Sequence, residues 1–348
     1  MSNEIFSAVL RKIRNHVILS KQKSVNLSFH GGEPCLIGTS LFRRWCSMAV
    51  DTLADIVDLD FSLQTNGTLL DSDWAQALTE FDVGVSLSLD GPPKVNDAVR
   101  VDHSGGGSHE AVIRGIQHLS EAGIDFTILC VCPLGEEPLA VHTHLLSLSP
   151  TAINYLFPDS ASLVRRGVNV NLGTPLADFL IPIFEDWWRG QIEKVDVILF
   201  RQMARMILGG HCKLDIFGNG PLGFLFIESD GSIESLDVLR ICGADFFPTH
   251  LNVLTDEFID VETKSSFASQ VLRGTIPIPD DCSLCPENKT CAGGYLPHRW
   301  RPQGGFNHCS IWCTDILKLF RHVRFALNVT PEETYVRRTA LNAFSIAR

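Results

Sequence analysis

The chain has 348 residues, enough for one large or two medium domains, and its 45% apolar and 20% charged content is ordinary for a globular protein. A net charge of −11 without a Lys/Arg run longer than a pair argues against a nucleic-acid backbone or an anionic membrane surface as a partner. No apolar run approaches the roughly 18–20 residues that a bilayer requires, and the first residues lack the apolar core and cleavage site of a secretory leader.

The first predicted element is an amphipathic helix, for which Ser2 or Asn3 is a suitable N-cap. Its apolar stripe consists of Ile5, Val9, Ile13 and Val17. Up to about residue 160, strand and helix patterns then alternate, and such βα repeats predict a parallel sheet, open or curled into a barrel. The sequence predicts strands over 25–30, 61–64, 83–89, 126–131 and 153–157, and helices over 39–54, 72–80, 108–122 and 138–148.

Three polar motifs follow these strands: HGGEP at 30–34, QTNG at 64–67 and SLSLDG at 86–91. Glycines let the backbone approach a ligand closely, and Glu33 offers an anion to a cationic group. Ligand sites of parallel α/β folds collect at the carboxyl ends of the strands, so this placement favours a binding site. The alternative is a set of ordinary tight turns and a solvated strand face.

The second half of the chain is predicted to be helical over about 174–208. A hairpin follows, with its turn at 229–231. A last helix is expected near 314–326, and the residues from 329 onward are polar.

A cysteine loop lies between the hairpin and the last helix. Cys282, Cys285 and Cys291 can curl around one metal centre, and Cys309 or Cys313 can complete the ligand set. Thiolate-only ligation suits Zn²⁺ or an iron–sulfur cluster. The chain has eleven cysteines and no secretory signal, which indicates reduced thiols in the cytoplasm rather than disulfides.

The order of these motifs resembles that of radical S-adenosylmethionine (SAM) enzymes. The segments that carry the resemblance are FHGGEP (29–34), QTNG (64–67), SLSLDGP (86–92), NDAVR (96–100) and GGGSHEAVIRGIQHL (105–119). The cysteine loop with the later WCTD is similar to a SPASM-type auxiliary-cluster domain. GGYLPHR and the FPD at 157–159 are similar to the FxsB-type branch of peptide and protein maturases.

The resemblance implies an α/β fold, a partial (β/α) barrel of radical SAM type whose first strand is missing, with a C-terminal SPASM-like domain. The implied divisions are a barrel at 1–160, a helical linker at 161–210, the SPASM-like domain at 211–328 and a polar tail at 329–348. The implied SAM ligands are Gly31, Gly32 and Glu33 at the methionine amino group, Ser88 and Arg100 at the ribose and carboxylate, and Gln64 and Asn66 in the same cavity. The implied ligands of an auxiliary [4Fe–4S] cluster are Cys282, Cys285, Cys291 and Cys313, with Cys309 and Cys242 as further candidates.

One element of that family is missing from the sequence. Radical SAM enzymes bind their SAM-cleaving cluster with a CxxxCxxC loop, whereas the first cysteine here, Cys35, follows HGGEP. A start codon placed too late, a degraded gene, or a non-radical partner protein would each account for this. The missing strand would leave an open sheet edge beside 25–29, where self-association or a partner strand is expected.

The resemblance therefore predicts a maturase that modifies a side chain of a ribosomal peptide or protein, and that is inactive as this chain alone. The alternatives are a non-catalytic, peptide-binding iron–sulfur scaffold and a structural zinc protein.

Overall fold

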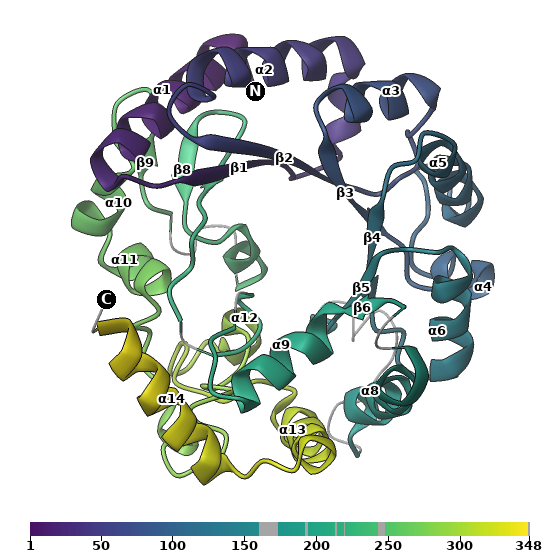
Figure 1. The fold of residues 1–348 in the computed structure, drawn as a ribbon, viewed down its shortest axis with the longest axis vertical. Helices are drawn as coiled ribbons and strands as arrows, with labels where there is room; N and C mark the ends of the chain where they lie inside the picture. The colour runs from purple at the N-terminus through teal and green to yellow at the C-terminus, as the bar shows by residue number, and fades with distance from the viewer. Residues whose placement is uncertain (160–172, 192–193, 213, 219, 243–247, 347–348) are drawn as a thin grey trace.

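A computed structural model describes residues 1–159, 173–191, 194–212, 214–218, 220–242 and 248–346. One sheet of six parallel strands, arranged in sequence order, forms the first part of the molecule (Figure 1). Its strands are β1 (Ser24–Phe29), β2 (Asp58–Thr65), β3 (Val83–Ser88), β4 (Phe126–Val131), β5 (Ala152–Leu156) and β6 (Asp196–Val197). The sheet curves, and helices cover its outer side, so the predicted partial barrel is confirmed.

The helices of this part lie close to their predicted ranges, apart from the short helix at Pro93–Asn96, which was not predicted. They are α1 (Asn3–Ser20), α2 (Thr39–Leu53), α3 (Ser72–Glu80), α4 (Pro93–Asn96), α5 (His109–Glu121), α6 (Pro138–Ser147), α8 (Pro175–Asp186) and α9 (Ile198–Ile207), with a short 3₁₀ helix η1 (Pro34–Ile37). The Oγ of Ser2 accepts a hydrogen bond from the Ile5 amide at 3.2 Å, so Ser2 is the N-cap of α1. None of the helices in the described part of the chain combines the length and apolar character that crossing a bilayer requires.

The two faces of the sheet differ in polarity because successive strand residues point to opposite sides. Phe61 and Leu63 of β2 are buried beneath the helices, whereas Ser62 and Gln64 point the other way. Ser62 donates a 2.7 Å hydrogen bond to the side chain of Asn26 on β1. The inner face of the first three strands is consequently polar, and it carries Ser24, Asn26, Ser28, Ser62, Gln64, Ser86 and Ser88.

The antiparallel hairpin sheet and the C-terminal helices close the ring opposite the parallel sheet (Figure 1). Their elements are β7 (Phe226–Ile227), β8 (Ser232–Glu234), β9 (Leu251–Asn252), the 3₁₀ helices η3 (Asp237–Cys242) and η4 (Asp280–Cys282), α10 (Ile259–Lys264), α11 (Ser266–Arg273), α12 (Leu296–Arg299), α13 (Cys313–Leu327) and α14 (Pro331–Ile346). The Asp315 carboxylate on α13 accepts hydrogen bonds from the first amides of α8, Leu176 at 2.8 Å and Ala177 at 2.9 Å. This capping contact fastens the C-terminal region to the barrel.

Two predicted segments differ in the structure. The helical stretch expected over 174–208 is interrupted by a π-helical turn at Trp187–Gln191 and by β6, whose buried Val197 pairs with Ile153 of β5. The residues from 331 form α14 instead of a polar tail, because Thr334 is buried against the barrel. The start of the predicted linker, 161–172, lies outside the described residues.

Strand β1 is hydrogen-bonded on one side only among the described residues, where it pairs with β2. We expect this edge to pair with a strand of another copy or a partner, because unpaired edges present rows of free N–H and C=O groups. Introducing charge on the exposed β1 positions, with Asn26→Lys and Ser28→Lys together, should then shift the assembly toward monomer in sedimentation equilibrium. A wild-type chain that is monomeric at every concentration would contradict this expectation.

Candidate functional site

Glu33 is held firmly at the point where β1 and β2 end. Its carboxylate accepts hydrogen bonds from the Thr65 hydroxyl at 2.6 Å, the Asn66 amide at 2.8 Å and the Cys35 amide at 3.0 Å. The preceding glycines border open space: a methyl group added to Gly31 or Gly32 would meet no atom within 4 Å. Gly31 has a φ of 85°, which only glycine adopts without strain. The backbone at this edge can therefore be approached closely by a ligand.

Gln64 and Ser88 extend this polar edge from β2 to β3. The Gln64 Nε2 lies 3.3 Å from the Ser88 Oγ, to which it donates a hydrogen bond. Asn66 behaves differently, because its side-chain oxygen accepts from the amide and hydroxyl of Thr68 and closes a local turn. Asn66 therefore reaches the edge through its backbone amide, which binds Glu33.

Arg100 forms a bidentate ion pair with Asp90 just beyond the end of β3. Its Nε lies 3.0 Å and its Nη2 3.2 Å from the two oxygens of that carboxylate. Asp90, whose side chain is 3% exposed, also accepts the Val131 amide at the end of β4. The ion pair fixes the guanidinium while leaving it partly exposed.

The predicted site residues thus lie one after another along the edge of the sheet where the strands end. Glu33 bridges β1 and β2, Gln64 and Ser88 bridge β2 and β3, and Arg100 sits where β3 and β4 end. Their predicted role in binding SAM remains a proposal.

Several polar residues were missed by the sequence analysis, and one of them, Asp237, contacts this edge. The Asp237 carboxylate of η3 lies 3.9 Å from the Nδ1 of His30, next to the two glycines. Burial and the charge of Asp237 raise the pKa of Asp215 to about 6. His298 is 4% exposed, neither of its ring nitrogens has a hydrogen-bond partner among the described residues, and burial lowers its pKa to about 4. The sequence offered a sign of a functional role only for His30 and His298, which belong to the motifs HGGEP and GGYLPHR.

Five cysteines line one small cavity in the C-terminal region: Cys282, Cys285, Cys291, Cys309 and Cys313. Cys242 is not among the described residues that line it. No three described Cys, His, Asp or Glu side chains are grouped closely enough to hold a single metal ion.

The electrostatics of these thiols follow from burial and from their mutual contacts. Burial raises the pKa of Cys291 to about 12. A hydrogen bond between Cys309 and Cys313 lowers the pKa of the first and raises that of the second. A metal centre must therefore displace protons from most of these thiols, and its affinity will fall as the pH is lowered.

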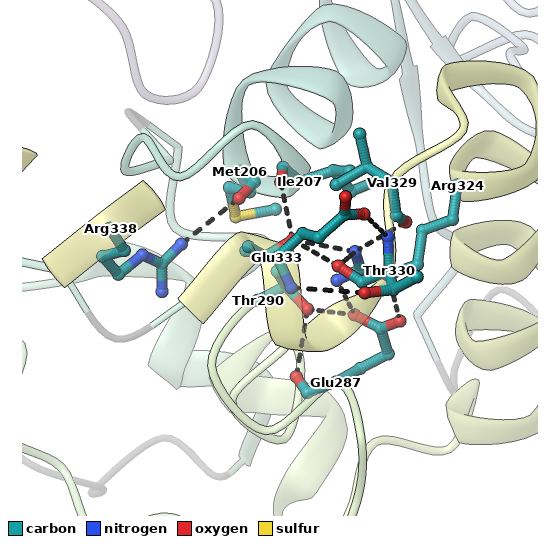
Figure 2. A network of polar contacts seen from close by, with 10 residues as sticks. Met206, Ile207, Glu287, Thr290, Arg324, Val329, Thr330, Glu333 and Arg338 are labelled. Atoms are coloured by element: carbon teal, nitrogen blue, oxygen red, sulfur yellow. Dashed lines mark hydrogen bonds and ion pairs between the residues drawn. The ribbon is translucent and has the colours of Figure 1, made fainter. Parts of the chain in front are cut away.

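A buried polar network anchors the cysteine loop (Figure 2). Glu287, between Cys285 and Cys291, is 2% exposed and accepts hydrogen bonds from Arg324 of α13 at 2.6 and 2.8 Å and from the Thr290 hydroxyl. Arg324 also donates to Thr334 of α14, whose hydroxyl in turn donates to the carbonyl of Ile207 at the end of α9. The ion pair thereby joins the loop to α13, and the hydrogen bonds of Thr334 extend this connection to α14 and to α9.

A larger cavity, of about 880 Å³, lies elsewhere. It is lined by Trp187, Trp188 and Arg201, together with Thr151 and Asp196 at the beginnings of β5 and β6. The cavity therefore opens at the edge of the sheet where the strands begin, whereas Glu33 lies at the opposite edge, where the strands end.

Comparisons with known proteins agree with this architecture. The profile of the Radical SAM superfamily matches residues 5–145. A cysteine-type anaerobic sulfatase-maturating enzyme of Clostridium perfringens (strain ATCC 13124) is 30% identical over 330 residues, which cover 92% of this chain and 86% of that enzyme. A serine-type anaerobic sulfatase-maturating enzyme of Klebsiella aerogenes is 29% identical over 286 residues, covering 79% of this chain and 67% of the relative.

Solved structures show the same fold. Native anSMEcpe with bound AdoMet superimposes with a TM-score of 0.80 at 20% identity, over 98% of this chain and 91% of that one. Streptococcus suis SuiB bound to precursor peptide SuiA gives a TM-score of 0.60 at 14% identity, over 90% and 69% of the two chains. The extent and identity of the Clostridium match establish that the chain belongs to the radical SAM maturase family that includes the anaerobic sulfatase-maturating enzymes.

Proposed function

We propose that this chain serves in the radical SAM modification of a side chain in a ribosomal peptide or protein. SAM would bind at the carboxyl edge of β1–β4, and an auxiliary [4Fe–4S] cluster would bind in the cysteine loop. The observation that carries the proposal is the edge itself, where Glu33, Ser88 and Arg100 follow one another beside open space. Peptide-bound anSMEcpe supports a peptide as the substrate class.

The residues at the edge suit the chemical groups of SAM. The Glu33 carboxylate and the backbone at Gly31 and Gly32 can accept hydrogen bonds from the methionine ammonium group. Arg100 has guanidinium donors beyond those it gives to Asp90, and these suit a carboxylate. Gln64 and Ser88 can bind ribose hydroxyls. When SAM is bound beside a reducing cluster, it supplies a 5′-deoxyadenosyl radical, and the protein supplies position.

The cysteine loop suits a cluster better than the zinc alternative. A tetrahedral Zn²⁺ site with bonds of about 2.3 Å requires four sulfurs within about 4 Å of one another. No three described donors are grouped closely enough to hold a single metal ion, while five cysteines surround one cavity. The ligands of a [4Fe–4S] cluster each bind a different iron and stand farther apart. We assign Cys282, Cys285, Cys291 and Cys313 as ligands and keep Cys309 as the alternative to Cys313.

We divide the chain accordingly into a barrel over 1–160, a connecting segment over 161–210 and a SPASM-like region over 211–328, to which α14 is attached. The many reduced thiols favour the cytoplasm as the compartment.

Replacing Glu33 with alanine should weaken SAM binding about tenfold or more, because a charge-assisted contact contributes roughly 1.5–3 kcal/mol. Isothermal titration calorimetry on the anaerobic protein measures this directly. Glu110→Ala is the matched control, since Glu110 is a highly exposed carboxylate on α5 that pairs only with Arg114 among the described residues. Equal affinity of wild type and Glu33→Ala would refute the placement of SAM at this edge.

The 348-residue chain by itself should not cleave SAM reductively. The sequence has no CxxxCxxC motif to supply three thiolates while leaving one iron open for SAM. Chromatography of a mixture of the chain, SAM and dithionite should show no 5′-deoxyadenosine above a chain-free blank. Formation of 5′-deoxyadenosine in wild type that is lost in Glu33→Ala would contradict the expectation.

The missing CxxxCxxC motif also favours a second candidate, a peptide-binding iron–sulfur scaffold that presents a substrate to another enzyme. A scaffold would bind peptide with equal affinity in wild type and Glu33→Ala. A maturase site would bind peptide more tightly when SAM is present.

A further inference from the structure

Arg299 is a buried cation beside the cysteine cavity. It ends α12, is 4% exposed, and lies behind Gly293 of the cavity wall, where an added methyl group would be 3.5 Å from its Cδ. Its guanidinium donates to the carbonyl of Phe306 at 3.0 and 2.7 Å and to that of Pro277 at 2.7 Å. These contacts fix its position without neutralising its charge.

No carboxylate among the described residues forms an ion pair with Arg299. Glu287, which also lines the cavity, is already neutralised by Arg324. Asp281 interacts with the thiols, but it is exposed to solvent, which screens its charge. Burying an uncompensated charge is costly, so an anion is expected close to Arg299.

The anion can come from the cysteines. Cys282 and Cys291 both lie close enough to Arg299 for their charges to interact with its guanidinium. Thiolate ligands of an iron–sulfur cluster would therefore provide the missing counter-charge at this position.

We propose that Arg299 is the fixed counter-ion of the cluster in the cysteine loop and that it raises the reduction potential of that cluster. The inference rests on the proposed iron–sulfur site and deepens it. Reduction adds one electron, and hence one negative charge, to a thiolate-ligated cluster that is already anionic. A cation that is held in place by backbone carbonyls and shielded from water stabilises the more negative state without having to reorganise.

The experiment is an anaerobic redox titration with dithionite, followed by electron paramagnetic resonance, on the full chain after iron–sulfur reconstitution. Arg299→Gln removes the charge but keeps donors for the two carbonyls, and Arg299→Lys keeps the charge. Arg273→Gln is the control, because Arg273 is an exposed cation on α11 that pairs with Glu262. Iron content and circular dichroism are measured for each variant.

Arg299→Gln should lower the ratio of reduced to oxidised cluster at a given potential by on the order of tenfold. For a one-electron couple this is a shift of about 59 mV to lower potential. Arg299→Lys should stay close to wild type, and Arg273→Gln should be unchanged.

The outcomes separate this inference from the proposed function. A wild-type chain that binds no iron refutes the cluster and the inference with it. A normal cluster whose potential is the same in wild type and Arg299→Gln refutes the inference alone, as does an equal shift in the lysine and glutamine variants. If only the glutamine variant fails to fold or to bind iron, the site requires a cation, which supports the inference. If the lysine variant fails too, Arg299 has a purely structural role and the inference is wrong.

Discussion

Replacing Cys285 with alanine is expected to abolish the iron–sulfur colour of the reconstituted protein and to destabilise its C-terminal region. Cys285 lines the cavity with four other cysteines, and a cluster cannot be held fully when one of its ligands is removed. Because a metal site exists only in the folded state, the free energy of metal binding contributes to folding. Iron per chain and the urea midpoint of unfolding measure the two effects.

Cys46→Ala is the matched control for this experiment. Cys46 is fully buried in α2, more deeply than the half-buried Cys285, and lies outside the cysteine loop, so its replacement removes a thiol but should leave the colour unchanged. Single alanine variants of Cys309 and Cys313 decide between the two candidate fourth ligands, since only the true ligand is required for a complete cluster. Colourless wild type containing one zinc and no iron would refute the cluster and establish the zinc alternative.

The barrel could be predicted from sequence because the residue patterns that specify its strands and helices each lie within one short segment. In β2, Leu59, Phe61 and Leu63 alternate with polar residues, and this two-residue period fixes which face is buried. The first helix, α1, has an equally clear apolar stripe and an N-cap at Ser2. The cysteine loop was predicted for the same reason, because its CxxC spacing lies within one short segment.

The contacts that complete the site are not local and could not be predicted. Asp237 reaches His30 across 207 positions of sequence, and Asp315 caps α8 from 139 positions away. Arg100 was expected at the carboxylate of SAM, and nothing in the sequence indicated that its guanidinium would pair with Asp90. The helix α14 was missed because its order depends on Thr334 packing against the carbonyl of Ile207, a tertiary contact that overrides a polar sequence.

Replacing Arg324 with methionine is expected to cost about 3–5 kcal/mol of unfolding free energy, because it leaves a buried carboxylate without its cation. Glu287 is 2% exposed and Arg324 is 8% exposed, so water cannot substitute for the lost partner. Thr334 also loses a donor, which should loosen α14 from α9. Urea unfolding of the chain, followed by circular dichroism, measures the change in stability.

The control is Arg321→Met, which removes an exposed cation from the same helix, α13, and should change stability by less than about 0.5 kcal/mol. The double variant Glu287→Met/Arg324→Met tests the cause, because removing both charges also removes the desolvation penalty. It should recover a large part of the loss, although the Thr290 hydroxyl then keeps only the backbone carbonyl of residue 287 as an acceptor. If the double variant is as unstable as the sum of the two single variants, the pair is not coupled. The network of Figure 2 would then act through packing of the side chains rather than through charge.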